Sequence, residues 1–298
     1  MARLDISQLP VPPARYRIDR LPTDPEGRLL FETRSFSRKE DSLRATGLRT
    51  VCKLPIYDQK TAIDLADRLD GPISGCDECL ASSRYMRTLR IKIIGNLWQL
   101  FEAEGLQPDQ LKFFTAMPKG WEFTPEMLDD VDPANLLERF RSQLRRAGSD
   151  DVDGWLIAAI HAEFEPETIV YKLHVHGFAT PNLIAVIDRL RALPAYRFKP
   201  NRAPPIQVSR KPLRDLPYPL GYPFKSFWPS RWIGPVGDSG IVKRQSFPSR
   251  IPEPYHSQVL VWLDRWAVSD TILLMKLRVG PDGFVISPQQ NAHQFEES

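Results

Sequence analysis

The chain contains few of the residues that mark a secreted, membrane-spanning or redox protein. Its 298 residues include only three cysteines and five histidines. An odd number of cysteines in a chain this long does not form a disulfide framework, which argues against thiol redox chemistry. No segment approaches the ~18 consecutive apolar residues of a membrane span, and the start lacks an apolar signal region. We therefore expect a cytoplasmic protein without a membrane partner.

The sequence also lacks a nucleotide-binding motif and a large net charge. The glycine-rich phosphate loop GxxxxGK[ST] is missing, so the chain has no recognisable motor for separating DNA strands. The formal net charge is only +3, from 40 basic and 37 acidic residues. Because nucleic-acid binding depends on where the positive charge lies, this small value neither indicates nor excludes such a partner.

Proline, in contrast, is abundant and divides the chain. Thirteen of the 28 prolines lie between Pro194 and Pro254, which predicts much irregular backbone there. Residues 1–50 show no sustained period and are interpreted as an extended N-terminal arm. Residues 51–108 form a cysteine-containing helical segment, with helical spacing from Ser82 to Gly105. Residues 231–298 form a C-terminal extension with a helix and a β-hairpin.

Residues 109–230 have the pattern of an α+β domain. Four β-prone runs and two helical segments alternate in the order β-α-β-β-α-β, and Asp132-Pro133 and Thr180-Pro181 supply the helix starts. This is the split βαβ, ferredoxin-like order, in which an antiparallel sheet carries both helices on one face. The other face is expected to be open and to hold a site. Many functions share this topology, so the fold alone does not identify the activity.

A candidate metal site lies on the third strand of this core. His174 and His176 project from the same face because strand side chains alternate, and two adjacent imidazoles chelate a divalent ion. Glu163 on the preceding strand is the preferred third ligand, with Glu165 in reserve. The simpler alternatives are a pair of surface or hydrogen-bonded histidines and a solvated turn around Glu165.

A candidate nucleophile follows the fourth strand. A phenol oxygen from Tyr222 or Tyr218 can attack a phosphodiester and form a covalent ester. Lys225 lies three residues after Tyr222, on the same side of a helical turn, where it would bind phosphate. The alternative for each tyrosine is a packing role with a polar tip.

Together, these segments resemble the HUH endonuclease superfamily. The similarity covers about 110–230 and rests on Phe113-Phe114-Thr115, His174-Val175-His176 and Tyr222-Pro-Phe-Lys225 in the expected order. It is strongest to rolling-circle replication initiators of plasmids and phages, and to single-strand transposases. The resemblance implies nicking and strand transfer on single-stranded or hairpin DNA at an origin or element end, through a 5′-phosphotyrosine, with a host helicase as partner.

The resemblance also implies roles for individual residues. His174, His176 and Glu163 would hold Mg²⁺ or Mn²⁺, Tyr222 would be the nucleophile, and Lys225 would bind the phosphate beside it. Tyr218 would be the second tyrosine of a two-tyrosine enzyme. The chain departs from the family pattern in its prolines, which crowd tyrosines that the family presents on a regular helix.

Two other groups of residues lie around this core. Cys52, Cys76 and Cys79 are a possible structural zinc site that lacks a clear fourth ligand, and three ordinary buried thiols are the alternative. Eight basic residues and no acidic ones lie in 189–214, interleaved with Tyr196 and Phe198, a pattern typical of a single-strand groove. The candidate DNA contacts in and near this run are Arg197, Lys199, Arg202, Arg210 and Lys211.

Two alternatives to a nuclease remain open at this stage. The first is a noncatalytic module that binds single-stranded nucleic acid on the same fold. The second is a metal enzyme of unrelated chemistry that shares only the His-x-His pair. A tyrosine directed at the histidines would favour the nuclease, and an enclosed small-molecule pocket would favour the unrelated enzyme.

Overall fold

The computed structural model describes residues 5–20, 31–52, 58–198, 203–209, 211–213, 215–225, 227–236, 242–244 and 249–287. The helices are α1 Arg34–Val51, α2 Gln59–Asp70, α3 Ser83–Ala103, α4 Pro125–Leu128, α5 Pro133–Arg146, α6 Pro181–Arg189, α7 Tyr255–Asp264 and α8 Val268–Thr271. A short 3₁₀ helix, η7, spans Tyr218–Phe224. The strands are β1 Lys112–Ala116, β2 Glu122–Phe123, β3 Leu156–Glu165, β4 Val170–Ala179, β5 Ile206–Val208, β6 Pro229–Ser230, β7 Ile233–Val236, β8 Val242–Arg244, β9 Ser249–Arg250, β10 Ile272–Met275, β11 Leu277–Gly280 and β12 Gly283–Ile286.

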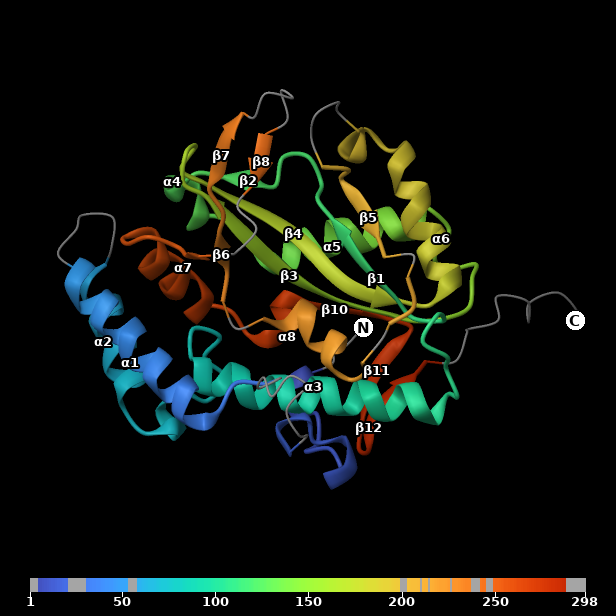
Figure 1. Ribbon diagram of the computed structural model, residues 1–298, viewed down its shortest axis with the longest axis horizontal. Coiled ribbons are helices and arrows are strands. Elements are labelled where there is room, and N and C mark those ends of the chain that lie inside the picture. Colours follow the sequence, from blue (N-terminus) through green and yellow to red (C-terminus); the bar gives the residue numbers. More distant parts are fainter. Residues whose placement is uncertain are drawn as a thin grey trace, which may run out of the picture.

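A mostly antiparallel sheet with helices packed on it forms the centre of the molecule (Figure 1). Its strand order is β5-β1-β4-β3-β6-β9, with β10 also pairing β3 and β2 also pairing β4. Only the short β3–β6 pairing is parallel. The predicted α+β class is therefore confirmed, and the central strands follow one another along the chain as β1-α5-β3-β4-α6-β5.

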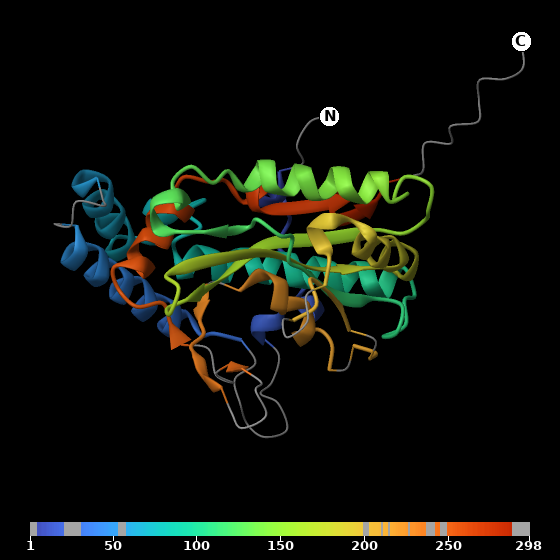
Figure 2. The ribbon, with the colours of Figure 1, turned by 90° about the horizontal axis from the view of Figure 1, so that it is seen from above.

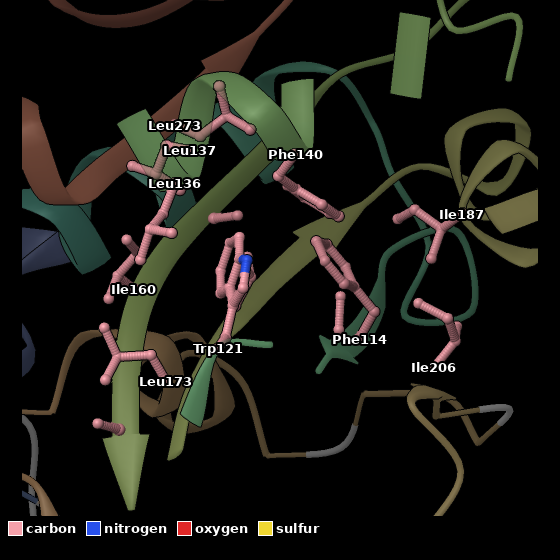
Figure 3. Packing of buried hydrophobic residues seen from close by; sticks show 14 of the residues in the cluster. Phe114, Trp121, Leu136, Leu137, Phe140, Ile160, Leu173, Ile187, Ile206 and Leu273 are labelled. Atoms are coloured by element: carbon pink, nitrogen blue, oxygen red, sulfur yellow. The ribbon is translucent and has the colours of Figure 1, made fainter. Parts of the chain in front are cut away.

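One face of the sheet packs against α5 and α6. Asp132 begins α5, since its side chain accepts a hydrogen bond from the Asn135 amide and proline follows at the first helical position. Phe140 of α5 stacks on Phe114 of β1 with ring centroids 6.3 Å apart (Figure 3). Val175 on β4 belongs to the same apolar cluster. Alternation along β4 therefore directs its even-numbered neighbours to the opposite face.

The opposite face is partly covered, so the expectation of an open face is wrong in part. Ile157 and Phe178 of this face lie in a second apolar cluster with residues of α3 and η7. η7 contacts both β3 and β4. In the view from above, α5 runs along one side of the sheet and the chain around β7 and β8 lies on the other (Figure 2). η7 consequently borders any site on this face of β3 and β4.

The N-terminal region differs from its prediction, because residues 34–51 form the helix α1 rather than an extended arm. Three of its six buried residues, Ser37, Asp41 and Arg44, are polar or charged, which explains why no apolar period was visible in the sequence. Asp41 is fully buried and accepts hydrogen bonds from Ser82, Ser83 and Arg84 at the start of α3. Polar contacts of this kind attach α1 to α3 without an apolar stripe.

The C-terminal residues are also more closely joined to the core than the sequence indicated. The hairpin is present as β11 and β12, but the preceding strand β10 pairs with β3 in the main sheet. Trp262 of α7 is buried and donates to the carbonyl of Val131. None of the helices among the described residues has the length and apolar run needed to cross a membrane.

Candidate metal centre and tyrosine

Three histidines from two neighbouring strands meet on the face bordered by η7. His174 and His176 of β4 share this face, and His161 of β3 lies opposite His174 in the strand register. One ring nitrogen of each histidine lies within 4.8 Å of those of the other two. All three side chains are buried, at 4 to 8% exposure. The predicted pair is thus confirmed as part of a group of three that could hold a metal ion.

Hydrogen bonds fix which nitrogen of two rings carries a proton. His174 Nδ1 lies 3.0 Å from the Lys172 carbonyl oxygen, and His161 Nε2 lies 3.2 Å from the Phe227 carbonyl oxygen. A carbonyl only accepts, so these nitrogens donate and the other nitrogen of each ring keeps its lone pair. Nδ1 of His161 is buried without a hydrogen-bond partner among the described residues. Such an orphaned acceptor in a histidine cluster fits a cation ligand.

The ring of His176 can adopt either neutral tautomer, because its partner Thr115 is a hydroxyl that both donates and accepts. His176 Nδ1 lies 2.8 Å from the Thr115 hydroxyl, and His176 Nε2 lies 2.9 Å from His174 Nε2. Without a cation, His176 donates through Nε2 to His174 while the threonine donates to Nδ1. Because a hydroxyl also accepts, the proton can instead reside on Nδ1, which frees Nε2 as a ligand. Thr115 therefore orients His176 for coordination.

Burial keeps the imidazoles of His161 and His176 neutral. Desolvation lowers the pKa of His161 and of His176 well below the usual range, and the neighbouring imidazoles lower the pKa further. Lys225 also contributes to the depression at both histidines. Neutral imidazole is the form that binds a metal, so the cluster is ready to coordinate at neutral pH.

We expect the metal-free protein to lose stability as the pH falls below about 6.5. The folded-state pKa values of His161, His176 and His256 are depressed, chiefly by burial, so the unfolded chain takes up protons first. The free energy of unfolding should fall by up to about 1.4 kcal/mol per pH unit for each histidine. Urea unfolding in EDTA at pH 7.5, 6.5 and 5.5 measures it. The slope of the unfolding free energy against pH should be smaller in His256→Asn. Equal stability of the wild type at all three pH values would contradict the prediction.

Glu163 does not join the group, which corrects the predicted ligand set. It follows His161 by two residues on the same face, but its carboxylate lies 3.2 Å from Nε of Arg231. Glu165, the reserve ligand, is buried and bound by Lys172 Nζ at 2.6 Å and by the Thr168 hydroxyl. The two carboxylates thus have cationic or hydroxyl partners, and the third member of the described cluster is an imidazole.

Tyr222 lies at the edge of the histidine cluster. Its ring is 5.2 Å from the ring of His176 and 4.9 Å from that of Phe113, both centroid to centroid. The side chain is 40% exposed, so a ligand can reach the phenol. Nζ of Lys225 lies 3.8 Å from the centre of the tyrosine ring. The structure therefore brings the predicted nucleophile, lysine and histidines together.

Tyr218 takes a different position on η7. In a 3₁₀ helix successive residues are about 120° apart, so residues three apart are aligned and residues four apart are not. Lys225 consequently follows Tyr222 on one side, whereas Tyr218 is rotated away by about one third of a turn. Tyr218 is half-buried and packs against the second apolar cluster. This arrangement favours one tyrosine at the histidines rather than two.

Lys225 is itself partly desolvated. Burial lowers the pKa of its ammonium group, and the positive charges of Arg231 and Arg90 lower it further. Arg90 is neutralised by a two-oxygen contact with Glu32 at 2.5 and 2.6 Å. Arg231 is likewise paired, with Glu163 at 3.2 Å. Lys225 is thus the cation that lies over the tyrosine ring, where it favours an anionic ligand.

The cysteines are not gathered into a zinc site among the described side chains. Cys52 and Cys79 are free, buried thiols in one apolar cluster, while the side chain of Cys76 lies outside the description. Burial, together with Asp264, which accepts its hydrogen bond, raises the pKa of Cys79 to about 12. For these two residues the structure favours ordinary buried thiols over zinc ligands.

Only part of the predicted basic run lies among the described residues. Arg197 and Lys211 are exposed, while Lys199, Arg202 and Arg210 lie outside the described residues. Tyr196 is buried, with its hydroxyl donating to Gln143, and so cannot stack on a base. Phe198 is 56% exposed. Of the two interleaved aromatic residues, only the phenylalanine remains available to nucleic acid.

His161 is the member of the histidine cluster that sequence reasoning missed. The signal was present: the chain has five histidines, and His161 precedes Glu163 by two residues, hence on the same strand face. A preference for carboxylate over imidazole as third ligand directed attention to the glutamate. Comparison with known proteins adds no assignment, because no family model, no curated protein and no solved structure matches this chain.

Proposed function

We propose that this protein is a metal-dependent HUH-type endonuclease that nicks and rejoins single-stranded DNA through Tyr222. The observation that carries the proposal is the position of the exposed Tyr222 ring, 5.2 Å from His176 in a buried three-histidine cluster. Lys225 over the same ring supplies a cation for the phosphate.

The topology supports the same proposal. The partial strand order β5-β1-β4-β3, with α5 and α6 as the connecting helices, is the order expected of a ferredoxin-like core. His174 and His176 lie on a central strand of this order, Phe113 to Thr115 on the strand beside it, and Tyr222 after the last strand. The three motifs of the resemblance thus lie on neighbouring elements, β1, β4 and η7.

The donor set indicates which ion the cluster would hold. Three neutral imidazoles suit transition metals, whereas Mg²⁺ prefers oxygen ligands. His161, His174 and His176 would therefore hold Mn²⁺ or another transition metal in preference to Mg²⁺. Such an ion supplies Lewis-acid polarisation of the phosphate to be attacked.

The chain's own residues then position and transfer the strand. The Tyr222 hydroxyl loses its proton as its oxygen bonds to phosphorus, the bond from phosphorus to the 3′-oxygen breaks, and that oxygen leaves as a 3′-hydroxyl after taking up a proton. Lys225 balances charge on the phosphate. Rejoining reverses these steps. Since the sequence has no phosphate loop, strand separation falls to a host helicase.

An adduct experiment tests the proposal. The protein is incubated with Mn²⁺ and single-stranded DNA from plasmid or phage origins and from transposon ends, then denatured and separated on a gel. We expect a protein–DNA adduct whose digestion yields a nucleotide-modified peptide containing Tyr222. The DNA that reacts distinguishes a replication initiator from a transposase. Binding of single strands without an adduct on any DNA would favour the noncatalytic module.

A further inference from the structure

A large basic cavity lies on the side of α3 that faces away from the sheet core. Its volume is about 840 Å³, and it is bordered by the start of α1, one face of α3, the end of α2 and the N-terminal segment. Six of the lining residues are cationic, namely Arg17, Arg34, Arg38, Arg84, Arg87 and Lys92. Asp70 is the acidic residue that lines it.

Internal ion pairs neutralise only some of these charges. Asp19 lies 2.8 Å from Arg17 and 3.6 Å from Arg87, and Asp41 lies 2.7 Å from Arg84. Asp70 is already bound by an arginine outside the cavity. Among the described residues, the lining cations therefore outnumber the carboxylates that contact or line the cavity by six to three.

Two arginines carry most of the unbalanced charge. Arg34 and Arg38 are exposed and one helical turn apart on α1. Within the described ranges, no carboxylate lies within ion-pair distance of either one. Between them lies Ser37, which lines the cavity and whose buried hydroxyl has no hydrogen-bond partner in the described structure. The wall formed by α1 thus offers unused cations and an unused polar group.

The dimensions indicate an extended anion rather than one phosphate ion. From Arg84 to Lys92 the cations extend about 12 Å along α3, given a rise of 1.5 Å per residue. The volume lies within the range of small-ligand pockets, about 300–1,000 Å³. A double helix, whose major groove alone is about 12 Å wide, would not enter such a space. A single strand with successive phosphates matches both the length and the volume.

We propose that this cavity binds the phosphate backbone of single-stranded nucleic acid and anchors the strand away from Tyr222. The choice of nucleic acid as the polyanion rests on the proposed function, but the binding does not depend on cleavage. The two regions adjoin through α3 and the residues before α1. Arg87 of the cavity and Arg90 near Lys225 both contact the ring of Phe31.

Binding of a fluorescent 30-nucleotide oligo-dT to the full-length protein in EDTA tests the proposal. The double variant Arg34→Glu/Arg38→Glu should weaken binding by about tenfold or more at 0.1 M salt. It should also reduce the slope of log affinity against log salt by about 1.4, because two phosphate contacts are lost at about 0.7 each. Both residues are exposed, and circular dichroism checks that the variant folds.

The matched control is Lys39→Glu/Lys60→Glu, which reverses two equally exposed charges on α1 and α2 outside the cavity lining. This control should change affinity less than threefold. Equal weakening by the two double variants would overturn the proposal in favour of general charge attraction. Oligo-dT binding that is unchanged in the cavity variant, with loss of tripolyphosphate binding, would assign the cavity to a small polyphosphate instead. If only the adduct experiment fails, the proposed nuclease activity is refuted. The assignment of the cavity to single-strand binding is then unaffected.

Discussion

Tyr222→Phe is expected to abolish adduct formation and to lower single-strand cleavage on the order of 10⁴-fold or more, the scale of loss when a nucleophile is removed. The substitution deletes only the hydroxyl. The ring can keep its contacts with Phe113, His176 and Lys225, so the fold and the metal site should be retained. Quantitative cleavage of a labelled strand in Mn²⁺, under single-turnover conditions, measures the effect.

Tyr218→Phe is the matched control for this measurement. The same hydroxyl is removed from the same 3₁₀ helix, but at a position rotated away from the histidine cluster, so cleavage should stay within tenfold of the wild type. If the adduct persists in Tyr222→Phe and disappears in Tyr218→Phe, the nucleophile is Tyr218. If both variants lose activity on a two-strand exchange substrate, the two-tyrosine mechanism stands.

Loss of metal binding in His161→Ala is the second large expected effect. Removing one of three imidazoles should weaken Mn²⁺ binding at least 100-fold, since a change in the outer shell alone costs 10- to 100-fold. Calorimetric titration of the metal-free protein measures the affinity directly, without any DNA. A parallel titration with Mg²⁺ should show much weaker binding to the wild type, because no carboxylate belongs to the described cluster.

Glu163→Gln is the control that separates the two candidate ligand sets. Its carboxylate contacts Arg231, so this variant should bind Mn²⁺ within about threefold of the wild type. His161→Asn accompanies the alanine variant and keeps a polar group in the buried position, which limits loss of folding. Strong metal binding by both His161 variants, with loss in Glu163→Gln, would restore the carboxylate as third ligand.

Much of the core could be predicted from local patterns. The helix starts at Asp132 and Thr180 depend on neighbouring residues alone, and proline at the next position is a signal visible in any sequence. The alternation in β4 placed His174 and His176 on one face without knowledge of the partner strands. Lys225 aligned with Tyr222 because both helix types bring residues three apart to one side.

The remaining features depend on contacts between distant segments. α1 was missed because half of its buried residues are polar, and the partners of Asp41 and Arg44 include groups about 40 positions away. His161 could be chosen over Glu163 only once Arg231 was known to lie beside the carboxylate. The separation of Tyr218 from Tyr222 follows from a 3₁₀ rather than an α-helical turn, a distinction that the proline-rich sequence did not settle.

The strands that pair with the outer edge of β3 determine the smallest fragment of the chain that can retain the histidine cluster. That edge is paired by β10 at Leu156 to Ala159 and by β6 only at Phe164, so the strand carrying His161 is held from both ends by later parts of the chain. A fragment cut to residues 109–230 would contain every predicted catalytic residue and still lose β10. It would expose an apolar strand edge, which invites pairing between molecules. A fragment meant to keep the histidine cluster should therefore include residues 272–275.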